Sequence, residues 1–488
     1  MAVSDTFSHR PATQGADPIA VSGKLPLVVW LYLLAVVIPV GVSLGPLVLT
    51  GVRIVLIVMI LPLMAQLFMG RFGKLFATDF LFIGHVLWTA VALVMNNPSQ
   101  VIQQTGSVGM EFLGGYVLGR AYIRTREDFT ALSKMLILFV LAMVPLALLE
   151  AVTGQVLIID LLKKVPGMRT IAYSIQERRF GLDRVQMGFS HPIHFGLFCS
   201  ITFSLCFVAM EGTFGTLRRW ITGAIIAATG FLALSSGAIL AIALQFGLIL
   251  WALMFAKVAK RWWILVGLFV LGYVVIDLLS NRKPIDVFMS YATFSAETAY
   301  WRALIFEFGM KNVWANPVFG IGLNDWVRPW YMHTSSVDNF WLLQAMRYGI
   351  PGFVTVTLGY VLIVVHVMRR DLTADPVLAV FRRAWVFTFL GLSFTLCTVH
   401  VWTSMYSFVF FMLGAGVWLI TAPVQEDCDP VTEQTPAHTA TRFARGLQTD
   451  TAQVRSPRGL VAPQRPSTPL KPRTTAPRYS RFDPPDGG

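Results

Sequence analysis

The fold is decided by the stretch LPLVVWLYLLAVVIPVGVSLGPLVLTGVRIVLIVMILPLMAQLFMG, residues 25–70, in which Arg53 is the one charged residue. In hydrocarbon every backbone hydrogen bond must be made within the protein, so each crossing is a helix of about 20 mostly apolar residues. The stretch is long enough for two crossings, and runs of the same kind continue along the chain. We predict about 12 membrane-spanning helices, near residues 26–43, 50–69, 78–95, 103–121, 132–152, 192–210, 219–234, 237–256, 262–280, 350–368, 383–400 and 403–421.

The composition of the whole chain is also typical of a membrane protein. Of its 488 residues, 55% are hydrophobic and 13% are charged, whereas soluble domains are roughly 25% charged. The net charge of +13 comes from short basic clusters between apolar runs and from the C-terminal segment. This is the pattern of topology determinants among membrane lipids, and no nucleic-acid partner is expected. The four cysteines form no CxxC pair, so we expect neither disulfides nor a metal site, and no cofactor is implied.

The positions of the basic clusters predict the topology. With a cytoplasmic N-terminus the clusters between spans all fall inside, as the positive-inside rule requires, and both termini are then cytoplasmic. No removable signal peptide is expected. The predicted parts are an N-terminal segment at 1–24, an all-α transmembrane domain at 25–421 and a disordered Pro/Arg-rich cytoplasmic tail at 422–488. The tail is either simply solvated or in contact with anionic lipid.

Two long loops lie on the outer side of this arrangement, at about 153–191 and 281–348. Function is expected there, because binding residues concentrate in loops that a rigid scaffold holds. Apolar residues in the second loop recur with helical spacing and predict a helix over 298–312, lying along the membrane surface. The following NPVFGIG, residues 316–322, predicts a turn, because proline and glycine interrupt helices.

The first outer loop ends in RRFGLDRVQMGFSHPIHFG, residues 178–196, and is basic on the side where basic residues are usually depleted. Arginine suits a pyrophosphate, because its planar fork donates paired hydrogen bonds and keeps its proton. Arg178, Arg179 and Arg184 are therefore candidates for binding a diphosphate. The alternative is that the loop arginines contact lipid headgroups or acidic neighbours such as Asp183.

Basic, acidic and aromatic residues alternate through residues 300–353 of the second loop. The Trp301-Arg302 pair begins this segment, and Arg328 and His333 lie near its middle. Anchoring at the membrane interface explains such aromatic residues in general. The alternative is that their flat faces stack on sugar rings.

The end of this segment, VDNFWLLQAMRYGIPGF, residues 337–353, resembles the loop-to-helix junction of the O-antigen ligase and O-antigen polymerase superfamily. The upstream PVFGIGL at 317–323, the Trp301-Arg302 pair and the arginine-rich loop are similar to that family's pattern, as is Arg53 at the outer start of the second span. The order of spans also resembles it. The resemblance covers residues 26–421 in layout and rests on short motifs.

The chain departs from the family's pattern at two points. Members commonly have a histidine directly before the asparagine, and this chain has Asp338 there, with His333 five residues earlier. Either Asp338 takes the histidine's role on the acceptor hydroxyl, or His333 reaches in. Members also often have a Ser-Arg-Gly turn in mid-bundle, where this chain has Ser235-Ser236-Gly237 and lacks the arginine.

The resemblance implies a GT-C-like bundle in the bacterial inner membrane, and a metal-independent glycosyltransferase with a polyprenyl-pyrophosphate-linked donor. Arg184 and Arg302 are the residues expected to bind the pyrophosphate, and Asp338 to act on the acceptor. The structural alternative for Asp338 is the N-cap of the helix that follows. Substrate-binding roles are expected for Arg179, Arg53, His191, His333, Asn339, Trp301 and Arg328.

Three hypotheses about the function follow from the sequence. The first is a polymerase of O-antigen or exopolysaccharide whose acceptor is another lipid-linked glycan, and the second is a ligase whose acceptor is the lipid A core. The third is a polysaccharide or lipid-linked glycan transporter, to which ionisable groups within spans would point: His85, Glu111, Glu150 and Asp277. Polysaccharide-export proteins are expected partners, and a scaffold role among them would leave the arginines without a catalytic task.

Overall fold

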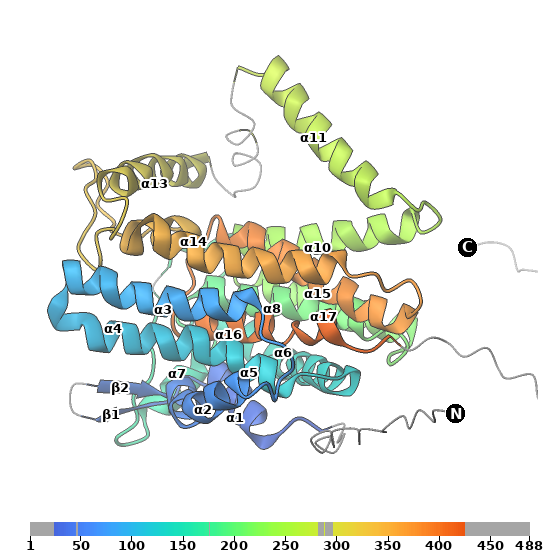
Figure 1. Ribbon diagram of the computed structural model, residues 1–488, viewed down its shortest axis with the longest axis horizontal. Helices are drawn as coiled ribbons and strands as arrows, with labels where there is room; N and C mark the ends of the chain where they lie inside the picture. Colours follow the sequence, from blue (N-terminus) through green and yellow to red (C-terminus); the bar gives the residue numbers. More distant parts are fainter. Residues whose placement is uncertain (1–23, 45–46, 175, 282–286, 288–295, 425–488) are drawn as a thin grey trace, which may run out of the picture. The chain divides into compact units, whose positions relative to one another are not determined.

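The computed structural model describes residues 24–44, 47–174, 176–281, 287 and 296–424. The described residues are mainly helical and include one antiparallel hairpin (Figure 1), which confirms the all-α class. The N-terminal segment up to residue 23, part of the second outer loop and the tail from residue 425 lie outside the described residues.

The elements up to the first outer loop are α1 (Leu27–Val37), β1 (Gly41–Leu44), β2 (Leu47–Thr50), α2 (Gly51–Phe68), α3 (Ala77–Asn96), η1 (Pro98–Gln100), α4 (Val101–Val108), η2 (Gly109–Gly114), α5 (Gly115–Tyr122), α6 (Arg126–Thr153) and α7 (Leu157–Lys163). After that loop come α8 (Pro192–Ser204), η3 (Leu205–Ala209), α9 (Thr216–Phe231), α10 (Ser236–Met254) and α11 (Arg261–Leu279). The remaining elements are α13 (Ala296–Ala315), α14 (Phe340–Arg369), α15 (Pro376–Leu396), α16 (Thr403–Gly414) and α17 (Trp418–Thr421).

Within the described residues, nine helices are long and apolar enough to cross a membrane. They are α2, α3, α6, α8 with η3, α10, α11, α14, α15, and α16 with α17. The other three expected spans are helical but shorter or interrupted. The span expected at 26–43 ends as a helix at Val37, because Pro39 cannot donate to a continuing helix, and the chain turns into the β1–β2 hairpin.

The other two differences concern α4 to α5 and α9. Residues 101–122 are helical throughout, but η2 is π-helical and interrupts the regular hydrogen-bond pattern around Glu111. Such π segments are frequent at functional or strained positions. Helix α9 has 16 residues, which is shorter than the usual crossing of about 20.

The centre of the bundle is formed by α8 and by α16 with α17, whose membrane-spanning windows are 94% and 83% buried. Helix α16 packs directly on α5, because glycines let the two backbones approach. An added Cβ at Gly119 would lie 2.1 Å from the Phe411 carbonyl oxygen, and one at Gly414 would lie 2.0 Å from the Tyr116 carbonyl oxygen. Close contacts between small residues are a usual means of helix association in membranes.

Helix α14 lies beside α3 (Figure 1) and begins at Phe340, earlier than the span expected from residue 350. It is kinked at Gly349, where φ is +70°. The kink and Pro351 leave carbonyl groups of the preceding turn without their helical donors. The amides of Ile321 and Gly322 supply the donors, to the carbonyl oxygens of Met346 and Arg347, at 2.8 and 3.0 Å.

The expected helix at 298–312 and the turn at 316–322 are both confirmed, as α13 and the segment that caps the α14 kink. Helix α13 packs on the first half of α14 through an apolar cluster that includes Ile305, Leu342 and Met346. The second outer loop therefore ends as a structured unit on α14. This packing holds the N-terminal turn of α13 near the loop that precedes α14.

Candidate functional site

Residues 178–186, here called the arginine loop, dock on the C-terminal end of α9. A helix leaves its last carbonyl groups without intrahelical donors. Two of the carbonyls just beyond α9 accept hydrogen bonds from this loop: Arg179 Nη1 donates to Leu234 O at 2.8 Å, and Arg184 Nε donates to Ala233 O at 3.3 Å. Both arginines are thus positioned by neutral carbonyl groups.

The other side of the arginine loop is held by the end of α6. The carboxylate of Glu150 accepts hydrogen bonds from the backbone N–H groups of Gln186 and Met187, at 2.7 and 3.2 Å. Met187 has a positive φ of 52°, a conformation that needs outside support in a residue with a side chain. The intramembrane carboxylate of Glu150 therefore has a structural task, which is to fix the loop that carries the arginines.

Arg178 differs from its two neighbours in the loop. It makes a two-pronged pair with Asp183, from Nε to Oδ1 at 2.9 Å and from Nη2 to Oδ2 at 2.8 Å, and it is largely exposed. This pair raises the pKa of Arg178. The alternative of an acidic neighbour in the loop therefore holds for Arg178. Arg184, by contrast, donates from Nη1 to the neutral amide oxygen of Gln176 at 3.0 Å.

The electrostatic surroundings of Arg184 are unfavourable to its own charge. Burial and, to a smaller extent, the neighbouring charge of Arg179 lower its pKa to about 10. Two half-buried guanidinium groups thus lie within electrostatic reach of each other. An anion between them would relieve their repulsion, because opposite charges interact strongly in a poorly hydrated site.

His191 begins α8, followed by Pro192 at the first helical position. Its Nδ1 accepts from the backbone N–H of Ile193 at 3.1 Å, so the neutral ring carries its proton on Nε2. Burial lowers the pKa of His191 to about 4, the charge of Arg184 lowers it as well, and the charge of Asp338 opposes them. His191 is therefore a neutral hydrogen-bond donor close to both Arg184 and Asp338.

Helix α13 brings Arg302 to the same place from the second outer loop. Burial lowers the pKa of Arg302, the charge of Asp338 raises it, and the charge of Arg179 lowers it. Its Nε is buried and has no hydrogen-bond partner among the described residues. A buried donor without a partner carries a large desolvation cost, which a bound ligand with acceptor oxygens would remove.

The start of α14 places Asp338 and Asn339 in different roles. The N-cap of α14 is Asn339, whose Oδ1 accepts from Leu342 N at 3.0 Å. The N-cap alternative for Asp338 is therefore wrong by one residue. The carboxylate of Asp338 accepts instead from Ser336 Oγ at 2.9 Å. It is half-buried and faces the arginines without being used to cap the helix.

These five residues are called the arginine cluster: Arg179, Arg184, His191, Arg302 and Asp338. They come from two outer segments that are more than a hundred residues apart in the chain, and each interacts electrostatically with at least one other member. Every member is among the site residues expected from the sequence. The structure thus brings together the two predicted pyrophosphate arginines and the predicted acceptor carboxylate.

The remaining predicted residues lie elsewhere. Arg328 donates to Asp325 at 2.6 Å and to the Met332 carbonyl at 2.9 Å, so it braces its own loop. His333 is exposed. Trp301 adjoins Arg302 in sequence, but its ring packs on the apolar cluster between α13 and α14. None of these three side chains has a described contact with the cluster.

Arg53 belongs to a second polar group at the start of α2. Its Nε donates to Glu111 Oε1 at 2.8 Å and its Nη2 donates to Ser107 Oγ at 2.6 Å. This pair gives the intramembrane Glu111 a bundle partner. The predicted substrate-binding role of Arg53 would require this arginine to reach the substrate from within an existing ion pair.

Sequence reasoning missed a group of rings on the inner side of the arginine cluster. The centroid of the Trp402 ring lies 5.9 Å from that of His191, 4.0 Å from that of His194 and 5.6 Å from that of His400. Burial and, to a smaller extent, the charge of Arg347 lower the pKa of His400 to about 3. The HPIH sequence and the polar HVW break between the last two spans were the available signals.

The helices are those of a membrane protein, and a model of one known family matches part of the chain. Nine helices among the described residues are long and apolar enough to cross a membrane, and three arginines and a carboxylate gather beyond one end of α6 and α9. A family model described as O-antigen ligase matches residues 221–357, from α9 into α14. The match supports an O-antigen ligase-like superfamily and confirms the resemblance noted in the sequence. A comparison with curated proteins gives no match.

Proposed function

We propose that the protein transfers an oligosaccharide from polyprenyl pyrophosphate to an acceptor glycan on the periplasmic face, as an O-antigen or exopolysaccharide polymerase. The observation that carries the proposal is the arginine cluster, in which half-buried guanidinium groups from two separate segments gather near the carboxylate of Asp338. The O-antigen ligase match over 221–357 covers Arg302 and Asp338 and supports the same conclusion.

The charge balance of the cluster favours a doubly charged ligand. Arg184 and Arg302 against Asp338 leave a surplus of positive charge, and the pKa values of these two arginines are both lowered because burial disfavours that charge. A pyrophosphate would offset the surplus and accept the unpaired N–H of Arg302. Such a preorganised positive site stabilises negative charge as it develops on a leaving group.

An apolar groove for the lipid tail begins beside the same loop. A cavity of about 410 Å³ lies among η3, α8, α9 and α10, with Trp220 near one end of α9 and Phe231 at the other. Phe231 is two residues before Ala233, whose carbonyl accepts from Arg184. Along α9 the groove extends for roughly 16 Å at 1.5 Å per residue. A polyprenyl chain in this groove would have its pyrophosphate at the arginine cluster.

The reaction needs one bond broken and one formed at the anomeric carbon. The bond from C1 to the pyrophosphate oxygen breaks, and polyprenyl pyrophosphate leaves with its negative charge stabilised by Arg184 and Arg302. The acceptor hydroxyl oxygen forms the new bond to C1, and its proton passes to the carboxylate of Asp338. Holding both substrates at this geometry supplies much of the rate acceleration, and proton removal adds to it.

The choice between polymerase and ligase depends on the acceptor. We favour the polymerase because the acceptor position holds Asp338, where ligase-like members commonly have histidine. The transporter hypothesis is less well supported, because most of the ionisable groups that suggested it have partners within the bundle. Glu111 pairs with Arg53, and Glu150 accepts hydrogen bonds from backbone amides. His85 Nδ1 contacts the Gly352 carbonyl at 2.9 Å. These groups are used to build the bundle.

The test uses the full chain in nanodiscs with lipid-linked oligosaccharide extracted from the cells that produce the protein. We expect longer lipid-linked oligosaccharides and stoichiometric release of polyprenyl pyrophosphate without any metal added. Arg184→Gln should lower the initial rate by about 10²- to 10³-fold. Arg169→Gln is the matched control, because Arg169 is an exposed arginine of the same outer loop and should leave the rate within about threefold.

Three results would count against the proposal. Equal losses in the Arg184 and Arg169 variants would mean that the loop's overall charge matters and not the arginine cluster. Elongation only when lipid A core is the acceptor would replace the polymerase with the ligase. Uptake of intact lipid-linked glycan with no change in its length would favour the transporter.

A further inference from the structure

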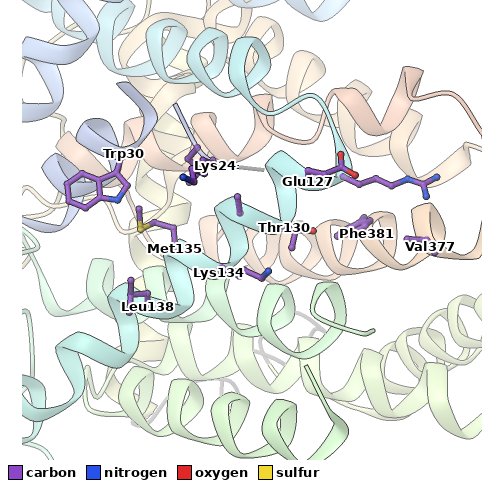
Figure 2. Close-up of a pocket in the computed structure, with 12 residues that line it drawn as sticks. Lys24, Trp30, Glu127, Thr130, Lys134, Met135, Leu138, Val377 and Phe381 are labelled. Carbon is purple, nitrogen blue, oxygen red and sulfur yellow. The ribbon is translucent and has the colours of Figure 1, made fainter. Parts of the chain in front are cut away.

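A cavity in the described part of the chain lies at the opposite end of α6 from the arginine loop. It has a volume of about 780 Å³ and is bounded by the residues before α1, by the first half of α6 and by the start of α15. Figure 2 shows its lining, in which Trp30, Met135 and Leu138 lie on one side and Glu127, Phe381 and Val377 on the other. We call it the basic-end pocket.

The polar part of the basic-end pocket carries a surplus of positive charge. Its charged lining residues are Lys24, Arg126, Lys134 and Glu127. Arg126 forms an ion pair with Asp375, so its charge is largely offset. Lys24 and Lys134 make no hydrogen bond or ion pair with any described residue, and both are exposed. Two ammonium groups therefore line the pocket, and the carboxylate of Glu127 offsets only one of their two charges.

Apart from Thr130, the rest of the lining is apolar, and its residues on α6 continue toward the depth of lipid chains. Helix α6 has 28 residues, which is longer than the roughly 20 that a crossing needs. Its apolar run begins at Met135, so Lys134 marks the level where hydrocarbon begins, and Leu138 lies one turn deeper. Leu138 is 59% exposed and Trp30 is 40% exposed. The pocket is thus amphipathic along the membrane normal.

We propose that the basic-end pocket binds one anionic phospholipid, with its phosphate between Lys24 and Lys134 and an acyl chain along Trp30, Met135 and Leu138. The charge and the depth of the lining together favour a lipid, because a free phosphate would leave the apolar half uncovered. Basic pockets between membrane helices are a known mode of anionic headgroup binding. The site lies at the other end of α6 from the arginine cluster and does not depend on the proposed glycan transfer.

The experiment is native mass spectrometry of the full chain, purified in detergent and titrated with phosphatidylglycerol or with phosphatidylcholine of the same acyl chains. We expect one tightly bound phosphatidylglycerol per chain and much weaker phosphatidylcholine binding. Lys24→Gln with Lys134→Gln should weaken phosphatidylglycerol binding by about 30-fold and leave phosphatidylcholine unchanged. Millimolar inorganic phosphate should not displace the lipid.

The matched control is Lys257→Gln with Lys260→Gln, two exposed lysines of the α10–α11 connection that do not line the pocket. This variant should bind phosphatidylglycerol within twofold of the wild type. Equal weakening in the two double variants would overturn the site, as would displacement by inorganic phosphate. A wild-type dimer that becomes a monomer only in the Lys24/Lys134 variant would instead assign the pocket to an interface between copies.

Discussion

Replacing Arg302 by alanine should reduce catalysis while leaving stability nearly unchanged. The guanidinium of Arg302 is half-buried, its charge is disfavoured by burial and by Arg179, and its Nε has no partner among the described residues. Without substrate, the Arg302→Ala variant therefore loses little stability beyond the attraction between Arg302 and Asp338. We expect the free energy of unfolding to change by less than about 1 kcal/mol.

The loss in activity should be much larger. If Arg302 contacts the leaving pyrophosphate, alanine removes one charge-assisted donor from the transition state, which typically lowers the rate constant by about 10²- to 10³-fold. Arg302→Lys should recover part of this loss, because it restores a point charge without the planar fork. The assay is the initial rate of polyprenyl pyrophosphate release in nanodiscs, at equal amounts of folded protein.

Arg328→Ala is the matched comparison for Arg302→Ala. Arg328 lies in the same outer segment, and it donates to Asp325 and to the Met332 carbonyl. Its loss should lower the melting temperature by about 2–5 °C and lower the rate per folded molecule by less than tenfold. The reasoning would be refuted if Arg302→Ala destabilised the protein as much as Arg328→Ala, or if it kept its rate within threefold of the wild type.

Three further predictions concern the supports of the site. Glu150→Gln weakens the anchoring of the arginine loop and should raise KM for the lipid-linked donor by about tenfold. The control variant Glu127→Gln should leave KM unchanged. Equal KM values in the two variants would contradict the role given to Glu150. Gly349→Ala should lower the free energy of unfolding by about 3 kcal/mol, because φ is +70° and an added Cβ would lie 2.0 Å from a carbonyl oxygen. The control is Gly247→Ala, where an added Cβ would have no atom of another residue within 4 Å. An equal loss of stability in the two variants would exclude the kink as the cause. The pKa of His191 is lowered to about 4 from an ordinary 6.5, so between these pH values the folded state binds fewer protons than the unfolded state, and the free energy of unfolding should fall as the pH drops from 6.5 to 4. His191→Asn, which retains a capping oxygen, should reduce the slope of this free energy against pH by up to about one proton. An unchanged slope would show that other groups cause the pH dependence.

The helices were predictable because their signals are local. Apolarity over some twenty residues identified the nine helices that meet the length of a crossing, and helical spacing identified α13. The NPVFGIG turn was also predictable, from proline and glycine. Its task was not, because the unpaired carbonyls of Met346 and Arg347 exist only once α14 is kinked at Gly349.

The candidate site was predictable in its residues and not in its supports. Residue chemistry and family resemblance depend on short motifs, and these were enough to predict Arg184, Arg302 and Asp338. The pairs Arg53 with Glu111 and Glu150 with Gln186 join residues 58 and 36 positions apart, and no local pattern specifies them. The N-cap of α14 is Asn339 and not its neighbour Asp338, and only the backbone conformation at the start of α14 decides between the two residues.

The central claim is tested most directly by a cryo-electron microscopy structure of the full chain in nanodiscs with polyprenyl pyrophosphate bound. We predict two phosphate groups within hydrogen-bond distance of Arg184 and Arg302, with the lipid tail along α9 and the carboxylate of Asp338 beside the freed oxygen. A diphosphate bound at any other place, with Arg184 and Arg302 still turned to their own loops, would contradict the account.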